Sequence, residues 1–153
     1  MTLRPLFVSL ALCLLVGTAA AQEREWTLDA SDQDAYLIFG VPESDDVGIS
    51  LWCPIRKGVV NVFVPEVSEN VEAGKKVTMQ LSAGDETASF EARAEVNAEA
   101  GVSSIEAEIP ADHPFLSAME KADRFRVSLG ADEKVFPLYE ADVAGLMQLC
   151  RKD

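Results

Sequence analysis

The sequence predicts an all-β domain, mainly an antiparallel β-sandwich of about eight strands, with two short helices in its last third. Two observations predict the sheet: apolar and polar residues alternate in successive segments, and short turns rich in polar residues or glycine separate these segments. Period-two alternation is typical of strands with one buried and one wet face. Only two segments, near 113–120 and 141–150, have helical spacing instead.

The first 21 residues have the layout of a secretory signal peptide. Arg4 supplies the positive start, residues 6–16 form the apolar core, and small residues end it, with cleavage expected after Ala21. This apolar run is shorter than the roughly 20 residues of a membrane-spanning helix, and an uncleaved anchor is the alternative. Removing 21 of the 153 residues leaves 132, residues 22–153, which is the size of a single domain.

Eight or nine strands follow. The segments are 25–30, 35–41, 49–53, 59–65, 76–83, 87–96, 102–110, 124–130 and a short one at 134–138. Pro54 ends the third, because proline has no N–H to donate to a ladder. "GDE" at 84–86 is a hairpin signal. The register is well specified, since a slip of one residue would bury the charged side chains.

Two helices complete the domain. Asp112 or His113 is expected to cap the first, with Pro114 at its first position. The second, near 141–150, places four residues at i, i+3, i+4 and i+7 on one apolar face, namely Val143, Leu146, Met147 and Cys150.

Two cysteines remain after the leader and its Cys13 are removed, Cys53 and Cys150. In an oxidising compartment such a pair indicates a disulfide, here between an early strand and the C-terminal helix. Trp52 is expected to pack on this bridge in the core, as in immunoglobulin-type sandwiches. A metal site would need more soft ligands, and the chain has one histidine. We expect neither a metal nor another cofactor.

The charge excludes some partners. Losing Arg4 with the leader leaves 12 basic against 26 acidic residues, a net charge of −14. No basic stripe is left to neutralise phosphates, so we expect no nucleic-acid binding and no stable membrane insertion or attraction to anionic lipid once the leader is removed. A cationic partner could be steered to the protein.

No catalytic constellation is visible. Asp112 and His113 are adjacent and cannot be interpreted as a dyad, and no G-x-S-x-G sequence occurs. The acidic runs at 29–34, 43–46 and 84–86 lack the spacing of a calcium loop. Pairs of carboxylates could serve glycoside hydrolysis, but spacing along the chain does not show their separation across a cleft.

The candidate binding surface combines aromatic residues with an acidic loop. Tyr36, Tyr139, Trp26 and Trp52 could stack on sugar or peptide, and Trp26 is the less constrained of the two tryptophans. The loop that follows 35–41 could carry binding, as loops at the ends of sandwiches do. The predicted surface therefore consists of Trp26, Phe39, Pro42, Glu43, Asp45 and Asp46.

Three features together resemble small periplasmic proteins of the invasion-associated locus B type. They are Trp26 opening the first strand after a signal peptide, Cys53 closing an early strand, and the stretch "VFVPEVSENVEAGKKVTMQL". That family usually has additional cysteines in its middle, whereas this chain has none between 53 and 150. The resemblance implies a secreted β-sandwich with a role at the cell envelope or in host interaction, without catalytic residues to carry over.

These observations favour an exported, periplasmic or secreted protein that is not an enzyme and acts as a binding or accessory module of the cell envelope. Its partner is an unidentified protein or envelope component. The alternatives are a carboxylate-based hydrolase of cell-wall glycan and a purely structural envelope protein.

A first prediction concerns the covalent structure. The exported protein should consist of residues 22–153, and under non-reducing conditions its mass should be two hydrogens below that of the reduced chain, because Cys53 and Cys150 are joined. Intact mass spectrometry with and without reductant measures this. Cytosolic protein with its leader attached and both thiols free would contradict it.

Overall fold

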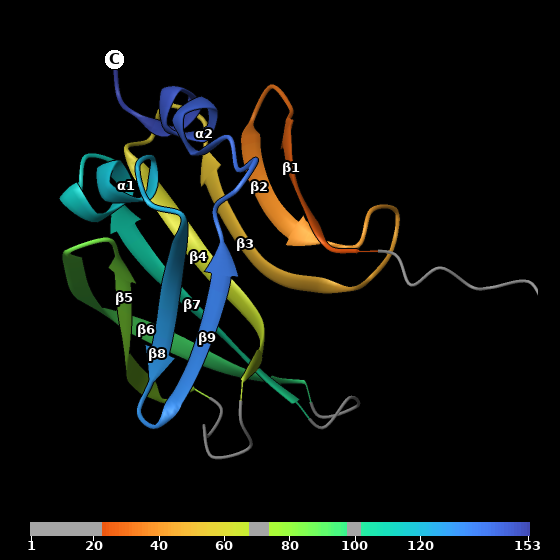
Figure 1. The fold of residues 1–153 in the computed structure, drawn as a ribbon, viewed down its shortest axis with the longest axis vertical. Helices are drawn as coiled ribbons and strands as arrows, with labels where there is room; N and C mark the ends of the chain where they lie inside the picture. Colours follow the sequence, from red (N-terminus) through yellow and green to blue (C-terminus); the bar gives the residue numbers. More distant parts are fainter. Residues whose placement is uncertain (1–22, 68–73, 98–101) are drawn as a thin grey trace, which may run out of the picture.

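The computed structural model describes residues 23–67, 74–97 and 102–153; the predicted leader lies outside them. In these ranges the chain forms nine strands and two helices (Figure 1). In chain order they are β1 (Glu25–Ala30), β2 (Asp34–Gly40), β3 (Val47–Pro54), β4 (Val59–Val67), β5 (Lys76–Ala83), β6 (Glu86–Asn97), β7 (Val102–Pro110), α1 (Pro114–Met119), β8 (Arg124–Leu129), β9 (Asp132–Pro137) and α2 (Val143–Cys150). The predicted antiparallel, mainly β architecture with two short helices is confirmed.

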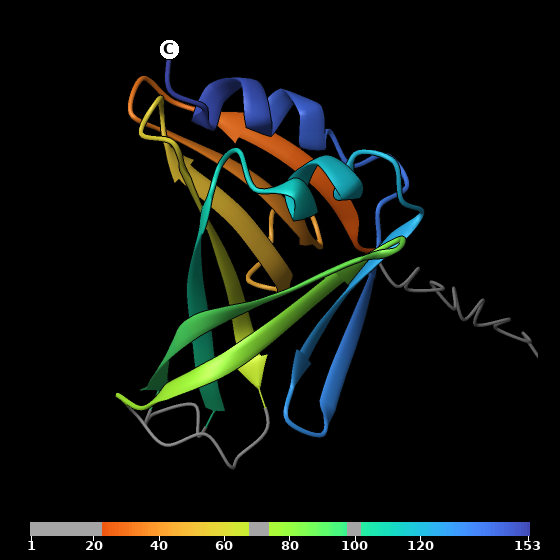
Figure 2. The same ribbon diagram turned by 90° about the vertical axis from the view of Figure 1, so that its left-hand side faces the viewer.

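All nine strands belong to one sheet, in the order β1-β2-β3-β4-β7-β6-β5-β8-β9. Every neighbouring pair is antiparallel. The sheet curls into a half-barrel, with β1–β4 on one side and the β5–β6 and β8–β9 hairpins on the other (Figures 1 and 2). The expected division into the two sheets of a sandwich is therefore not seen. β4 and β7 connect the two sides through backbone hydrogen bonds, from Val59 opposite Pro110 to Val67 opposite Ser103, which alternation within single strands cannot predict.

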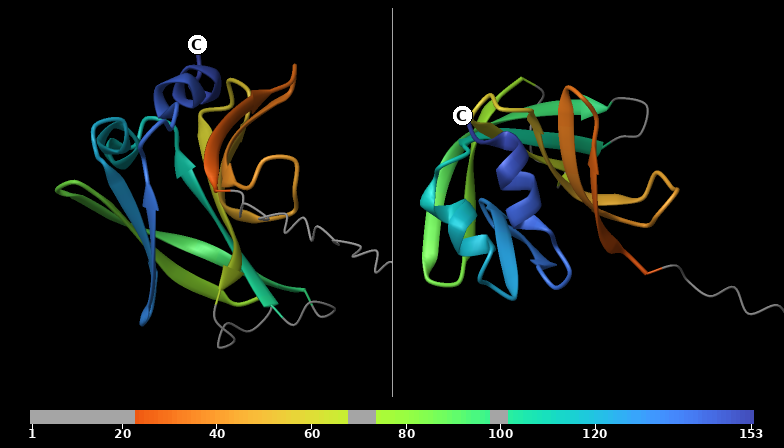
Figure 3. Two further views of the ribbon diagram at one scale, coloured as in Figure 1. Left: turned by 45° about the vertical axis from the view of Figure 1, so that its right-hand side comes forward. Right: turned by 90° about the horizontal axis from the view of Figure 1, so that it is seen from above.

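The inner face of the curl is the core. The alternation predicted for β4 and β7 is confirmed, because Val60, Val62 and Val64 and the facing Ile105, Ala107 and Ile109 are all buried. Both helices lie over one open end of the curled sheet (Figure 3). α1 contacts β5 and β6, whereas α2 contacts β2 and β3.

A side-chain cap precedes each helix, and the cap of α1 is His113, one of the two residues predicted for it. His113 caps α1: its Nδ1 accepts a hydrogen bond from the backbone N–H of Phe115 at 3.1 Å, and Pro114 occupies the first turn. Asp142 caps α2 by accepting from the N–H of Gly145 at 2.8 Å. Side-chain caps of this kind satisfy backbone donors that the helix leaves unpaired.

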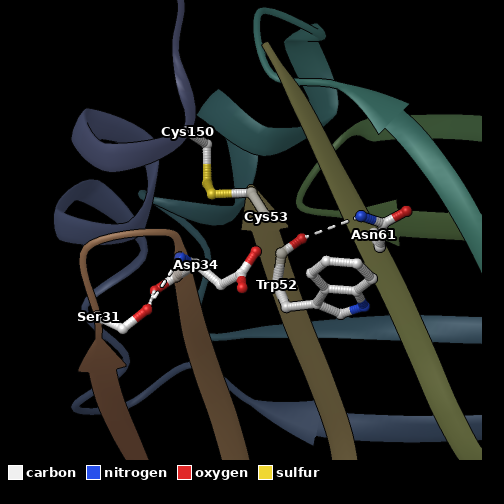
Figure 4. Close-up of a disulfide and its surroundings, with 6 residues drawn as sticks. All are labelled: Ser31, Asp34, Trp52, Cys53, Asn61 and Cys150. Carbon is white, nitrogen blue, oxygen red and sulfur yellow. Dashed lines mark hydrogen bonds between the residues drawn. A yellow bond between two sulfur atoms is a disulfide. The ribbon is translucent and has the colours of Figure 1, made fainter. Parts of the chain in front are cut away.

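The predicted disulfide between Cys53 and Cys150 is confirmed (Figure 4). It joins the end of β3 to the last turn of α2 across 97 residues of sequence, and both cysteines are completely buried. Two backbone hydrogen bonds lie beside it: Arg56 donates to Leu149, and Gly58 donates to Cys150, each at 2.8 Å. The C-terminal helix is thus tied to the β3–β4 turn both covalently and through the backbone.

Trp26 holds the two edges of the sheet together at one end. It lies on edge strand β1, and its indole N–H donates to the carbonyl of Pro137, at the end of the other edge strand, β9, at 2.6 Å. Its ring packs against Phe39 and Phe125, with centroid distances of 5.2 and 6.4 Å.

Removing the disulfide should lower the free energy of unfolding by about 2–5 kcal/mol, because the unfolded chain regains the freedom that closure of so long a loop removes. A double variant, Cys53→Ala with Cys150→Ala, tests this by urea denaturation. Reductant should lower the midpoint of the wild type and leave that of the variant unchanged. Equal stability of oxidised wild type and variant would contradict the prediction.

Trp26→Phe keeps an aromatic ring in the cluster and removes the bond to Pro137. It should reduce the free energy of unfolding by about 1 kcal/mol, the net value of a typical hydrogen bond. The exposed Tyr139→Phe is the matched control and should have no effect in the same urea titration. Unchanged stability of Trp26→Phe would show that this bond does not hold the edges together.

Candidate functional site

The six residues of the predicted binding surface fall into an aromatic pair, Trp26 and Phe39, whose ring centroids are 5.2 Å apart, and four residues of the loop that follows β2. Trp26 and Phe39 point to the inner face, where they belong to an aromatic cluster with Phe125 and Phe136. Both are only half-buried, but their ring contacts are those of packing residues. No observation assigns a ligand to either of them.

The other four residues lie on the loop between β2 and β3. Pro42 and Glu43 line a shallow hollow of about 310 Å³. Glu43 has a left-handed backbone conformation, with φ of 57°, which is uncommon for a residue other than glycine. Asp45 is exposed, and Asp46 forms an ion pair with Arg24, whose Nε lies 3.0 Å from the carboxylate. That these residues bind a partner stays a prediction.

Trp52 does not pack on the disulfide, contrary to the expectation from immunoglobulin-type domains. Neighbouring residues of a strand point to opposite faces, so Cys53 faces the core and Trp52 faces outward. Its indole extends from β3 toward Asn61 on β4 (Figure 4). The indole N–H donates to a carboxylate oxygen of Glu106, on β7, at 2.7 Å, so the ring lies across the intervening strand.

Tyr36 extends this aromatic surface. It is directly opposite Trp52 in the β2–β3 ladder, and the two rings are nearly parallel, at 19°, with centroids 6.0 Å apart. Tyr36 is 37% exposed, while Trp52 is half-buried. The outer face of β2 and β3 therefore presents two adjoining rings, one of them fixed by a hydrogen bond to a charged group.

A polar hollow of about 270 Å³ adjoins the rings on the same face. Asn61 and Glu106, which are neighbours of Trp52, form part of the wall of this hollow. The hollow is therefore continuous with the two rings. Its lining comes from β4, β5, β6 and β7, namely Asn61, Phe63, Lys76, Glu91, Ala92, Arg93, Glu95, Ser104, Glu106 and Glu108. We call Tyr36, Trp52 and this hollow the outer-face site.

The hollow holds four carboxylates and two cations. Lys76 is paired with Glu91, at 2.6 Å. Arg93 lies opposite Glu106 in the β6–β7 ladder but forms no ion pair with any residue that the structure describes. One carboxylate oxygen of Glu106 instead accepts from Trp52. The site thus offers a guanidinium that has no carboxylate partner among the described residues, beside an excess of carboxylates.

The remaining candidates from the sequence lie elsewhere. His113 caps α1 and packs edge-on against Phe90, with centroids 5.0 Å apart. Tyr139 is 74% exposed beside Glu140, and its pKa is raised because the hydrogen bond to Glu140, and then the charge of Glu140, favour the protonated phenol. Neither residue lines the outer-face site.

Within 23–67, 74–97 and 102–153, no three residues among His, Cys, Asp and Glu are grouped so that they could hold a metal ion. Neither helix in these ranges has the length and apolar character needed to cross a bilayer.

Compared with known proteins, the chain matches no family model, no curated protein and no solved structure. The resemblance to proteins of the invasion-associated locus B type therefore stays a prediction. Any function assigned to the chain has to rest on the geometry of its own residues.

Proposed function

We propose that the protein is an exported, non-enzymatic binding or accessory protein of the cell envelope, and that its ligand binds at the outer-face site. Its partner is an envelope component or protein, not nucleic acid, and it is not inserted in a membrane after the leader is removed. The leader-like residues 1–21 and the Cys53–Cys150 disulfide support a periplasmic or secreted location, since disulfides persist in oxidising compartments.

The observation that carries the binding function is the position of Trp52. A half-buried tryptophan on the outer face of a sheet, with its N–H held by Glu106 at 2.7 Å, has lost its rotational freedom before any ligand arrives. A ligand that packs on it therefore orders one flexible side chain fewer, which lowers the entropic cost of binding. The adjoining Tyr36 enlarges the contact, and aromatic residues are the typical anchors of binding sites.

A carboxylate-based hydrolase of cell-wall glycan is the second candidate, because four glutamates line the hollow. Glycoside hydrolysis needs an acid whose pKa is raised and a second carboxylate at a fixed separation. Glu91, Glu95 and Glu108 are exposed, and two of the four carboxylates are already engaged, Glu91 by Lys76 and Glu106 by Trp52. This favours binding over hydrolysis at this site.

The proposed function predicts that immobilised residues 22–153, with the disulfide intact, retain an envelope component from an extract. Tyr36→Ala should reduce the retained amount about tenfold, the effect of losing roughly 1.4 kcal/mol of contact. Tyr139→Ala, which removes an exposed tyrosine outside the site, should retain as much as the wild type. Quantitative mass spectrometry of the eluate compares the three proteins.

Equal retention by Tyr36→Ala and wild type would place binding elsewhere on the molecule. Release of soluble fragments from purified cell-wall glycan, abolished by Glu108→Gln, would contradict the non-enzymatic function and support the hydrolase.

A further inference from the structure

We propose that the ligand of the outer-face site is a saccharide chain without acidic groups, composed of neutral or amino-bearing sugars. This inference rests on the proposed binding function and specifies the class of ligand. It follows from three properties of the site: adjoining aromatic rings, a hollow with groups of both charge signs, and an excess of negative charge.

The aromatic rings suit the apolar face of a sugar. One face of a pyranose ring carries mainly C–H groups, which pack on the faces of aromatic side chains. Tyr36 and Trp52 lie on neighbouring strands, 6.0 Å apart and inclined by only 19°. Because this stacked pair extends from β2 to β3, it suits consecutive rings of one chain better than a single compact ligand.

The hollow continues the same line across the sheet. Residues that face one another in successive ladders run from Tyr36 to Trp52, then to Asn61 and to Glu108. A chain packed on the two rings and lying across the strands therefore reaches the amide of Asn61 and the carboxylate of Glu108. The hollow, at about 270 Å³, lies just below the roughly 300–1,000 Å³ of clefts for drug-sized ligands, which suits one polar part of a longer ligand.

The mixture of polar groups favours hydroxyls over a ligand of a single charge sign. A chain of amines without hydroxyls would offer no acceptor to Lys76 and Arg93, while an acidic ligand would meet four carboxylates. Hydroxyl groups both donate and accept. They can donate to Glu108 and accept from Arg93, which has no carboxylate partner among the described residues.

The excess of carboxylates sets the charge selectivity. Four carboxylates against two cations give the hollow a net charge of −2, within a chain whose formal charge is −13. This field repels uronic acids and other acidic sugars and tolerates amines, and salt weakens the discrimination.

The test measures binding to residues 22–153, with the disulfide intact, by isothermal titration calorimetry at low salt. The probes are a tetramer of N-acetylglucosamine, a tetramer of glucosamine, a tetramer of galacturonic acid and an octapeptide of lysine. The first two should bind, and the uronic acid tetramer should not. Tyr36→Ala should weaken binding of both bound tetramers about tenfold, Arg93→Gln should weaken it severalfold, and Tyr139→Ala should leave it unchanged.

A second experiment tests whether the excess of carboxylates causes the exclusion of acidic sugars. Glu91→Gln with Glu108→Gln removes two carboxylates and makes the hollow neutral, so the galacturonic acid tetramer should bind to this variant. Both positions are exposed, so the fold should be retained, and circular dichroism checks it. Continued exclusion of the uronic acid tetramer would overturn the assignment of selectivity to this excess charge.

The outcomes separate this inference from the proposed function. If only the lysine peptide binds, and Tyr36→Ala weakens its binding, the saccharide class of the ligand is wrong and the proposed binding function stands. If the tetramers bind equally well to wild type and Tyr36→Ala, the assignment of saccharide binding to the outer-face site is wrong. If a tetramer is cleaved, the ligand class stands and the non-enzymatic function is overturned. If no probe binds while the envelope extract still yields a Tyr36-dependent partner, only the saccharide inference is overturned.

Discussion

The disulfide between Cys53 and Cys150 is the constraint on which the rest of the structure depends, because it fixes both faces of β3. Cys53 is held in the core against the last turn of α2. Its neighbour Trp52 must then face outward, since successive residues of a strand alternate. Trp52 reaches Glu106 across β4, so the covalent bond inside the sheet determines where the aromatic surface outside it lies. Of these two adjacent residues, Cys53 thus contributes to stability and Trp52 to the candidate site.

A sheet of nine strands that does not close leaves two edges, and exposed edges invite unwanted pairing. Here the curl brings the edges together at one end, where Trp26 donates to the carbonyl of Pro137. The two tryptophans therefore have different tasks. Trp26 faces inward and joins the edges, whereas Trp52 faces outward and is available to a ligand.

The charge of the chain and that of the outer-face site have the same sign, yet the site is not simply an acidic patch. Lys76 is paired with Glu91, while Arg93 has no such partner among the described residues. A single-signed surface would select ligands by charge alone. A surface with donors and acceptors of both signs beside aromatic rings selects by the arrangement of hydroxyls, and net charge then excludes acidic ligands.

The sequence by itself determined the strands, the positions of both helices with the first capped by Asp112 or His113, and the pairing of the cysteines. Each depends on neighbours in the chain: alternation, capping side chains, or the only two cysteines left after the predicted leader. Only the tertiary structure decided that the strands form one curled sheet, because the β4–β7 pairing joins segments separated by β5 and β6. The tertiary structure also decided where the outer-face site lies. Alternation along β3 would already have placed Trp52 opposite Cys53 and on the outer face, but its contact with Glu106 spans 54 residues of sequence and a whole strand. No local pattern encodes a contact of that kind, since it exists only once the register of three strands is set.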